Sequence, residues 1–215
     1  MQTFDESTDE EAFVWMVKNS VVPRPIAWVS TIDANGVGNL APYSYFTLVT
    51  MYPPTLMISF IGQKDTLDNI EATGEFVVNM IAAGQAEVAT ASAAILPSHI
   101  DESELLGLTT SASTHIAPPR LADARVALEC TLLQQTTVLD ARVVFARVVA
   151  IHVDDGIIGA DGRISYGAYN PVARLGGSLY TSVTNEYRHV VPVATPEWLA
   201  EQAGTDARLP TFRTP

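Results

Sequence analysis

Lys64, Asp65 and Thr66 form the segment whose residue types and spacing most clearly indicate binding chemistry. Lys64 is one of three basic residues before position 120, and the same stretch contains fourteen acidic residues. It stands between an apolar run and a helix-like pattern, where an ammonium group, a hydroxyl and the free N–H groups of a helix start can surround a phosphate. The segment therefore predicts a phosphate site, with a solvated loop lysine as the alternative.

A second candidate cluster runs from Asn39 to Ser44 and reads N-L-A-P-Y-S. Its small side chains allow a planar ligand to approach the backbone, and Asn39 and Ser44 can form hydrogen bonds with the ligand's edge. The cluster is consistent with a ligand-binding turn, and the alternative is a polar bend between two strands.

A dinucleotide-binding fingerprint is not supported, although Gly36, Gly38 and Ala41 fit the pattern G-x-G-x-x-A. That fingerprint needs a helix to begin at the glycines, so that the helix N-terminus faces a pyrophosphate. Here Pro42 and a β-prone aromatic run follow at once. The glycines therefore predict a hairpin turn.

Other reactive residue types predict no catalytic or metal site. Cys130 is the single cysteine and lies inside a strand pattern beside Glu129, which predicts a buried and inert thiol. The histidines lack the i, i+4 spacing of a helical metal site, and no G-x-S-x-G nucleophile elbow occurs. The four histidines are His99, His115, His152 and His189.

The elements that must position these clusters are mostly strands. Periodicity and turn residues predict a hairpin over 25–41, strands at 55–61, 75–81, 126–138 and 141–153, and helices at 9–18, 65–74, 84–96 and 196–204. Asp65 or Thr66 is expected to cap the helix at 65–74, and Gly74 to end it. Because no βαβ alternation occurs, the pattern predicts a mainly β (α+β) fold, a barrel or sandwich with a few peripheral helices.

Composition limits the function classes. The 215 residues favour one domain, and the net charge of −12 disfavours binding to nucleic acids and anionic membranes. Charged residues make up 17% of the chain, below the usual value of about 25%, which favours an oligomer. No membrane-length apolar run or signal peptide is recognisable, so a cytoplasmic location is expected.

Six short motifs together resemble the flavin-reductase-like family, and most closely its flavoredoxin-like branch. They are PRPIAWVST, a D-x-x-G turn, N-x-APYS-x-F, Pro53-Pro54, KDT-x-x-N-I and GEFVVN, in this order. The resemblance covers about residues 15–185. It implies an FMN-binding split β-barrel, a homodimer, and one domain over residues 1–215, with a loose acidic arm at 1–8 and a C-terminal extension at 181–215.

The resemblance also implies where FMN binds. The N-x-APYS turn would lie along the isoalloxazine and ribityl chain, Lys64 and Thr66 would hold the phosphate, and Asp65 would shape that turn. No side chain is expected to be catalytic, and Arg24 and Asn79 are expected to be structural. The implied cofactor-binding residues are Thr31, Asn39, Ala41, Pro42, Tyr43, Ser44, Ser59, Ile61, Lys64, Asp65, Thr66 and Arg174.

One departure from the family leaves the electron donor open. Many family reductases carry a Gly-Asp-His motif whose histidine helps to place the nicotinamide, and here the corresponding residues 139–142 read L-D-A-R. Three functions therefore remain: an FMN-dependent oxidoreductase with NADH or NADPH as candidate donor, an FMN-holding electron carrier without a nicotinamide site, and a related oxidase of pyridoxal-type phosphates.

Overall fold

The computed structural model describes residues 1–7, 9–183, 185–191 and 193–203. The chain divides into two compact units, Met1–Thr184 and Asn185–Pro215. The second contains helix α6 (Pro196–Ala203), as the sequence pattern predicts, although Gly204 lies outside the described residues. Residues 1–7 form no helix or strand. One domain with an extension from residue 181 stays a prediction.

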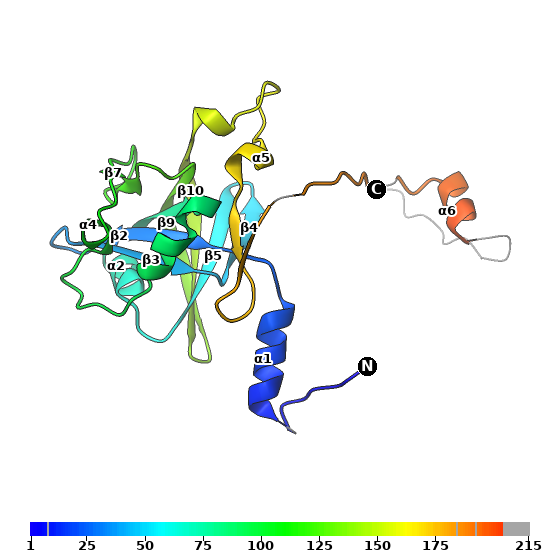
Figure 1. Ribbon diagram of the computed structural model, residues 1–215, viewed down its shortest axis with the longest axis horizontal. Coiled ribbons are helices and arrows are strands. Elements are labelled where there is room, and N and C mark those ends of the chain that lie inside the picture. The colour runs from blue at the N-terminus through cyan, green and yellow to red at the C-terminus, as the bar shows by residue number, and fades with distance from the viewer. Residues whose placement is uncertain (8, 184, 192, 204–215) are drawn as a thin grey trace. The chain divides into compact units, whose positions relative to one another are not determined.

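The first unit is built on a seven-stranded antiparallel sheet in the order β3-β2-β6-β9-β10-β5-β4 (Figure 1). Strands β3 and β4 are its two ends, and β3 also contacts β5 because the sheet curls. The strands are β2 (Ala27–Ile32), β3 (Gly38–Tyr43), β4 (Phe46–Met51), β5 (Pro54–Ile61), β6 (Glu75–Met80), β9 (Val126–Val138) and β10 (Ala141–Val153). The mainly β fold predicted from the sequence is confirmed.

Three short strands form a second sheet, and two more form a small hairpin. The three-stranded sheet contains β1 (Arg24–Pro25), β11 (Val172–Arg174) and β12 (Tyr180–Ser182), and the hairpin contains β7 (Thr110–Ser111) and β8 (Arg120–Leu121). The helices of this unit are α1 (Glu10–Ser20), α2 (Asp65–Thr73), η1 (Ala83–Gln85), α3 (Ala86–Ala91), α4 (Glu102–Leu105), η2 (Asp155–Ile157) and α5 (Tyr166–Tyr169). Helix α1 has no buried residue and extends away from the sheet (Figure 1).

The predicted hairpin at 25–41 forms β2 and β3 because Asp33 organises the turn. Its Oδ1 accepts hydrogen bonds from the N–H groups of Asn35 and Val37, both at 2.8 Å. Gly36 has φ +86°, a backbone conformation that favours glycine. The turn fixes the register Thr31↔Asn39, which places Asn39 beside Thr31.

The inner face of the curled sheet packs the main core, which includes Val29, Phe60, Phe76 and Val144. Cys130 belongs to this core and is fully buried, as expected. Burial, followed by the charge of Glu129, raises the pKa of the Cys130 thiol well above its ordinary value. The thiol therefore stays protonated and unreactive at neutral pH.

Part of the outer face is covered by residues 113–121, since Ser30 of β2 donates to the Pro119 carbonyl and Asn79 of β6 accepts from the Leu121 N–H. A buried carboxylate holds this covering segment. Glu129 is 0% exposed, and its two oxygens accept hydrogen bonds from the N–H of Thr114 at 2.6 Å and of His115 at 2.8 Å. His152 Nε2 lies 2.6 Å from Glu129 Oε1. Glu129 therefore joins β9, β10 and the covering segment.

Two expectations about helices are wrong. The helix expected at 84–96 ends at Ala91, and Ser92 instead accepts a hydrogen bond from Trp28 Nε1 at 2.8 Å, which fixes the chain where it leaves the helix. Neither Asp65 nor Thr66 caps α2. Lys64 is the N-cap residue and makes no side-chain cap hydrogen bond, because an ammonium group has no acceptor for a helix N–H.

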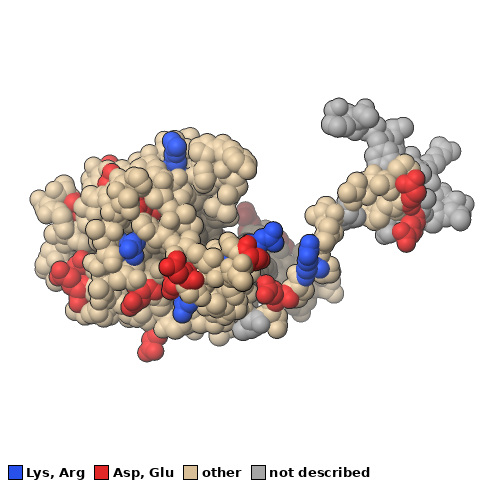
Figure 2. Space-filling model, turned by 90° about the horizontal axis from the view of Figure 1, so that it is seen from above, with Lys and Arg blue, Asp and Glu red and all other residues tan. Residues whose placement is uncertain are grey.

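The surface carries few charges. On the face shown in Figure 2, acidic and basic side chains are scattered over a mainly uncharged surface. Among the residues that the structure describes, no helix is long and apolar enough to cross a membrane.

Candidate functional site

A pocket of about 410 Å³ lies where the N-terminus of α2 meets the end strand β3. The segment at 92–96 and the start of α4 complete its walls. The lining residues are Asn39, Ala41, Pro42, Tyr43, Gln63, Lys64, Asp65, Thr66, Ser92, Ala93, Ala94, Ile95, Leu96 and Glu102. Both clusters singled out in the sequence therefore border one cavity.

The N-terminus of α2 offers hydrogen-bond donors to this pocket. Leu67 and Asp68 donate their N–H groups to the Lys64 carbonyl, whereas the N–H groups of Asp65 and Thr66 have no hydrogen-bond partner within the described part of the chain. A helix start with free N–H groups attracts anions, and the Lys64 ammonium adds a positive charge there.

The Thr66 hydroxyl is fixed so that its own hydrogen remains available. Thr66 is buried, and its Oγ1 accepts hydrogen bonds from Asn39 Nδ2 at 2.7 Å and from the Tyr43 hydroxyl at 2.8 Å. A hydroxyl has two acceptor positions and one donor, so both acceptor positions are used. The O–H of Thr66 is then free to donate to a ligand in the pocket.

A polar network connects this hydroxyl to the sheet. Asn39 Nδ2 also lies 3.3 Å from Thr31 Oγ1, which accepts a further hydrogen bond from Asn69 Nδ2 at 3.0 Å. Burial raises the pKa of Tyr43 to about 12, against the opposing effect of its hydrogen bond to Thr66, so the phenol keeps its proton and remains a donor. The network orients donor groups and contains no general base.

A smaller pocket of about 110 Å³ adjoins the first, since Pro42 and Ala93 line both. Its polar lining residues are Ser44, Thr90, Arg174 and Tyr180. The Arg174 guanidinium lies 4.6 Å from the centre of the Tyr180 ring and donates to its hydroxyl.

The structure therefore brings most of the expected cofactor-binding residues together. Asn39, Ala41, Pro42, Tyr43, Lys64, Asp65 and Thr66 line the larger pocket, and Ser44 and Arg174 line the smaller one.

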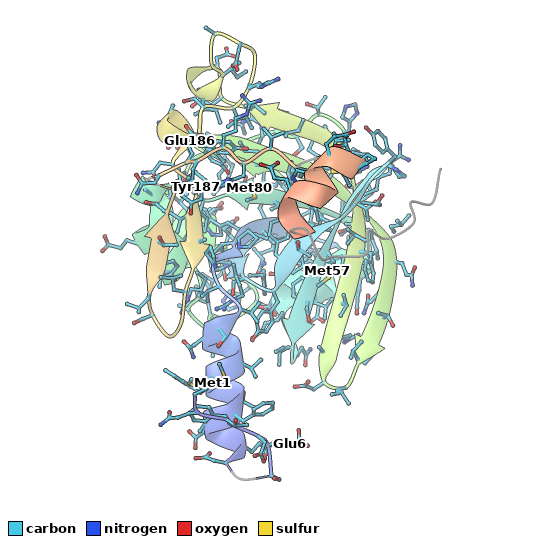
Figure 3. The ribbon with its side chains drawn as sticks, turned by 90° about the vertical axis from the view of Figure 1, so that its right-hand side faces the viewer. Met1, Glu6, Met57, Met80, Glu186 and Tyr187 are labelled. Atoms are coloured by element: carbon cyan, nitrogen blue, oxygen red, sulfur yellow. The ribbon has the colours of Figure 1, made fainter. Side chains whose placement is uncertain are left out.

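Three expected residues do not line either pocket. Thr31 is buried, and its hydroxyl oxygen accepts a hydrogen bond from Asn39 Nδ2. Ser59 and Ile61 lie further along β5 than Met57, which Figure 3 labels, and outside both pockets. Their contact with a cofactor remains a prediction.

Arg24 and Asn79 have the structural roles expected of them. Arg24 donates to the carbonyls of Lys18 and Val21, at 2.7 and 2.8 Å. Asn79 is fully buried, donates to the Trp28 carbonyl at 3.0 Å and accepts from the Leu121 N–H at 2.9 Å.

Glu102 is the charged pocket residue that sequence reasoning missed. It lies in the segment 97–120, which the sequence marks only as polar and loop-like. Its Oε2 accepts a hydrogen bond from the Leu40 N–H at 2.8 Å. No local pattern distinguishes this carboxylate from the other acidic residues, because its partner lies 62 positions away.

The groups in the pocket suit a ligand that carries an anionic group. Small and apolar residues form part of the lining, and the ammonium, the Thr66 hydroxyl and the helix N–H groups lie together at the start of α2. In the described residues no cluster of histidine, cysteine and acidic side chains could hold a metal ion. A helix N-terminus beside small and apolar lining residues suits a planar cofactor that carries a phosphate.

Comparison with known proteins identifies the family. Residues 19–169 match the family described as the flavin reductase like domain, and the chain belongs to that family. The expected resemblance is therefore confirmed, and with it a flavin-related oxidoreductase function.

Solved structures agree with this assignment. The 2-nitrobenzoate 2-nitroreductase of Pseudomonas fluorescens is 32% identical with a TM-score of 0.82, over 91% of this chain and 98% of its own. Nitrilotriacetate monooxygenase component B from Bacillus cereus is 30% identical with a TM-score of 0.82, over 88% and 98%. The flavoredoxin of Desulfovibrio vulgaris shares the fold at 20% identity and a TM-score of 0.73, over 81% and 93%. The split-barrel fold is confirmed.

Proposed function

We propose that this protein is an oxidoreductase that binds FMN in the pocket between β3 and α2 and passes electrons from a reduced donor to the flavin. The observation that carries the proposal is the donor set in the wall of the pocket: the Lys64 ammonium, the hydroxyl of Thr66 and the free N–H groups at the start of α2. These groups suit a phosphate, which FMN has and riboflavin lacks.

The chain's own residues bind and orient the cofactor in this proposal. Lys64 supplies charge, and Asn39 and Tyr43 hold the Thr66 hydroxyl with its hydrogen directed away from them. Ala41 and Pro42 leave room for a flat ring beside the backbone. When bound, the flavin supplies the electron-transfer chemistry, so no side chain has to act as an acid or base.

An electron carrier without a nicotinamide site is the second candidate, and a specific position favours it. Leu139 has φ +54° at the turn between β9 and β10, the left-handed conformation that suits the glycine of the family's Gly-Asp-His motif. Ala141 takes the place of that motif's histidine and pairs with Ile61 of β5. An alanine cannot form a hydrogen bond with a nicotinamide through its side chain.

Anaerobic reduction tests the proposed function. We expect that the protein loaded with FMN shows the flavin absorption bands, and that NADH or NADPH bleaches them within the time of a steady-state assay. If dithionite bleaches the bands and neither nicotinamide does, the carrier function replaces the reductase function. If the protein binds no flavin but binds pyridoxal phosphate, the oxidase alternative replaces both.

We further propose that the protein is a homodimer. Large apolar side chains are exposed on two separate elements, on α1 (Val14, Trp15 and Val17) and on β4 (Leu48, Val49 and Met51). Leu133 and Ile151, on the long strands β9 and β10, are also exposed. Obligate interfaces bury about 2,000 Å² or more, and the sparse surface charge suits one (Figure 2).

Light scattering tests the oligomeric state. We expect a particle of twice the 23.1 kDa chain mass at micromolar concentration. Replacing Val49 with Asp should shift the particle toward the chain mass if β4 lies in the interface, because a charge would then be buried there. A wild-type particle of 23.1 kDa would contradict the proposal.

A further inference from the structure

Glu102 is a buried carboxylate in the wall of a pocket that otherwise suits an anion. It is 6% exposed and lies at the first position of α4. It borders the same pocket as Lys64 and Thr66. The function proposed above makes no use of it, and a negative charge there opposes the binding of a phosphate.

The position of this carboxylate is fixed by the docking of α4 on β3. Asp101 caps α4 by accepting from the Ser103 N–H at 2.7 Å, and its carboxylate lies where a side chain on Gly38 would have to go. Glu102 Oε2 accepts from the N–H of Leu40, which lies on the end strand β3. The carboxylate cannot turn away from the pocket without leaving that N–H unpaired.

The charges around Glu102 come mostly from other carboxylates. Asp101 precedes it on the same segment, Asp65 and Lys64 face the pocket from the start of α2, and Tyr43 faces it from β3 as a neutral phenol. The 92–96 wall contains no titratable side chain. Burial, followed by the nearby charges of Asp101 and Asp65, raises the pKa of Glu102 above its ordinary value despite the Leu40 hydrogen bond.

We infer that Glu102 determines the affinity of this pocket for the phosphate end of the flavin, and that binding of the phosphate takes up a proton at Glu102. This inference rests on the proposed FMN site. A protonated Glu102 keeps one oxygen for the Leu40 N–H and gains an O–H that donates to the phosphate. An ionised Glu102 repels the same phosphate. Affinity for FMN therefore falls as the pH rises through the pKa of Glu102.

Glu102→Gln is the direct test, because glutamine keeps the shape and the acceptor for Leu40 but cannot ionise. We expect FMN to bind Glu102→Gln about tenfold more tightly than wild type at pH 8, with riboflavin affinity unchanged. The matched control is Glu104→Gln, which removes one charge from an exposed position on the same helix and should leave both affinities unchanged. Flavin fluorescence titrations between pH 5.5 and 8.5 give all the constants.

The pH dependence supplies a readout that a merely structural role would not change. The ratio of the wild-type FMN affinity to the Glu102→Gln affinity should fall as the pH rises. The flavin phosphate loses its second proton near pH 6, and because this ionisation affects both proteins equally, it does not change the ratio. Calorimetry of the wild type in two buffers, at several pH values from 7 to 8.5 where that phosphate is mostly a dianion, should show proton uptake with FMN in the range where the two affinities diverge, and none with riboflavin.

Three results would overturn the inference. FMN affinity that is unchanged or weaker in Glu102→Gln would do so, as would an equal change for FMN and riboflavin. If the variant does not fold, absence of proton uptake by the wild type at every pH from 7 to 8.5 overturns it. A wild type that fails to distinguish FMN from riboflavin refutes the proposed phosphate site itself, which separates the two failures.

Discussion

Lys64→Ala is expected to weaken FMN binding by about 1.5–3 kcal/mol, or roughly tenfold to a hundredfold, and to leave riboflavin binding nearly unchanged. The net charge of −12 opposes binding of a phosphate dianion at long range, so local groups must overcome that repulsion. Lys64 is the one basic side chain that lines the larger pocket, in the part of the chain that the structure describes. Its ammonium therefore contributes a large part of the phosphate affinity.

The fold should survive this change, because Lys64 lies at the surface and contributes no core volume. Lys18→Ala is the matched control: it removes the same charge from an exposed position on α1 and should leave both flavin affinities unchanged. Equal weakening of FMN and riboflavin in Lys64→Ala would mean that Lys64 holds the loop rather than the phosphate. If neither flavin weakens, the phosphate lies elsewhere, and Arg174 becomes the next candidate.

Glu129→Gln is expected to lower the free energy of unfolding by about 2–4 kcal/mol near neutral pH. The substitution replaces a buried carboxylate that accepts hydrogen bonds from Thr114, His115 and His152. One glutamine oxygen cannot serve all three donors, and the amide N–H₂ faces a donor instead of an acceptor. Urea unfolding of wild type and variant measures the difference.

The same carboxylate makes stability depend on pH. Burial acts to raise the pKa of Glu129, but the N–H donors of Thr114 and His115 and the His152 ring outweigh it, so the pKa lies below its ordinary value. Because the pKa is lower in the folded state, the stabilisation is present above the unfolded-state pKa, near 4.3, and is lost as the pH falls through the folded-state pKa. Wild type and Glu129→Gln should therefore converge in stability in acid.

Glu75→Gln is the matched control for this prediction. Glu75 is half-buried and accepts from the N–H of Ala117 at 2.9 Å, in the same covering segment, but this hydrogen bond is exposed. We expect a loss below about 1 kcal/mol, because water can replace an exposed hydrogen bond. Equal losses in the two variants would contradict the special role of the buried carboxylate.

The regular parts of the fold could be predicted from sequence because their signals are local. The strands at 126–138 and 141–153 have the predicted bounds, since each is a long β-prone run beside clear turn residues. Gly74, with φ +73°, ends α2 where it is expected. Strand β4 could not be found, because only Phe46 of its six residues is buried and no alternating pattern results.

The candidate site also contains residues with a local sequence signal and residues without one. Lys64 and Thr66 are neighbours in sequence, and a helix start brings their groups together without help from the rest of the fold. Glu102 could not be predicted because its place depends on how α4 docks against Gly38 and Leu40. The early end of α3 also depends on a distant contact, since Ser92 accepts a hydrogen bond from Trp28 Nε1 on β2.

The central claim is that the pocket between β3 and α2 binds a flavin through its phosphate. Fluorescence titration of the wild-type protein with FMN and riboflavin, in one buffer at one pH, tests it most directly. The account predicts one FMN per chain, bound at least tenfold more tightly than riboflavin. Equal affinity for the two flavins, or no binding of either, would contradict it.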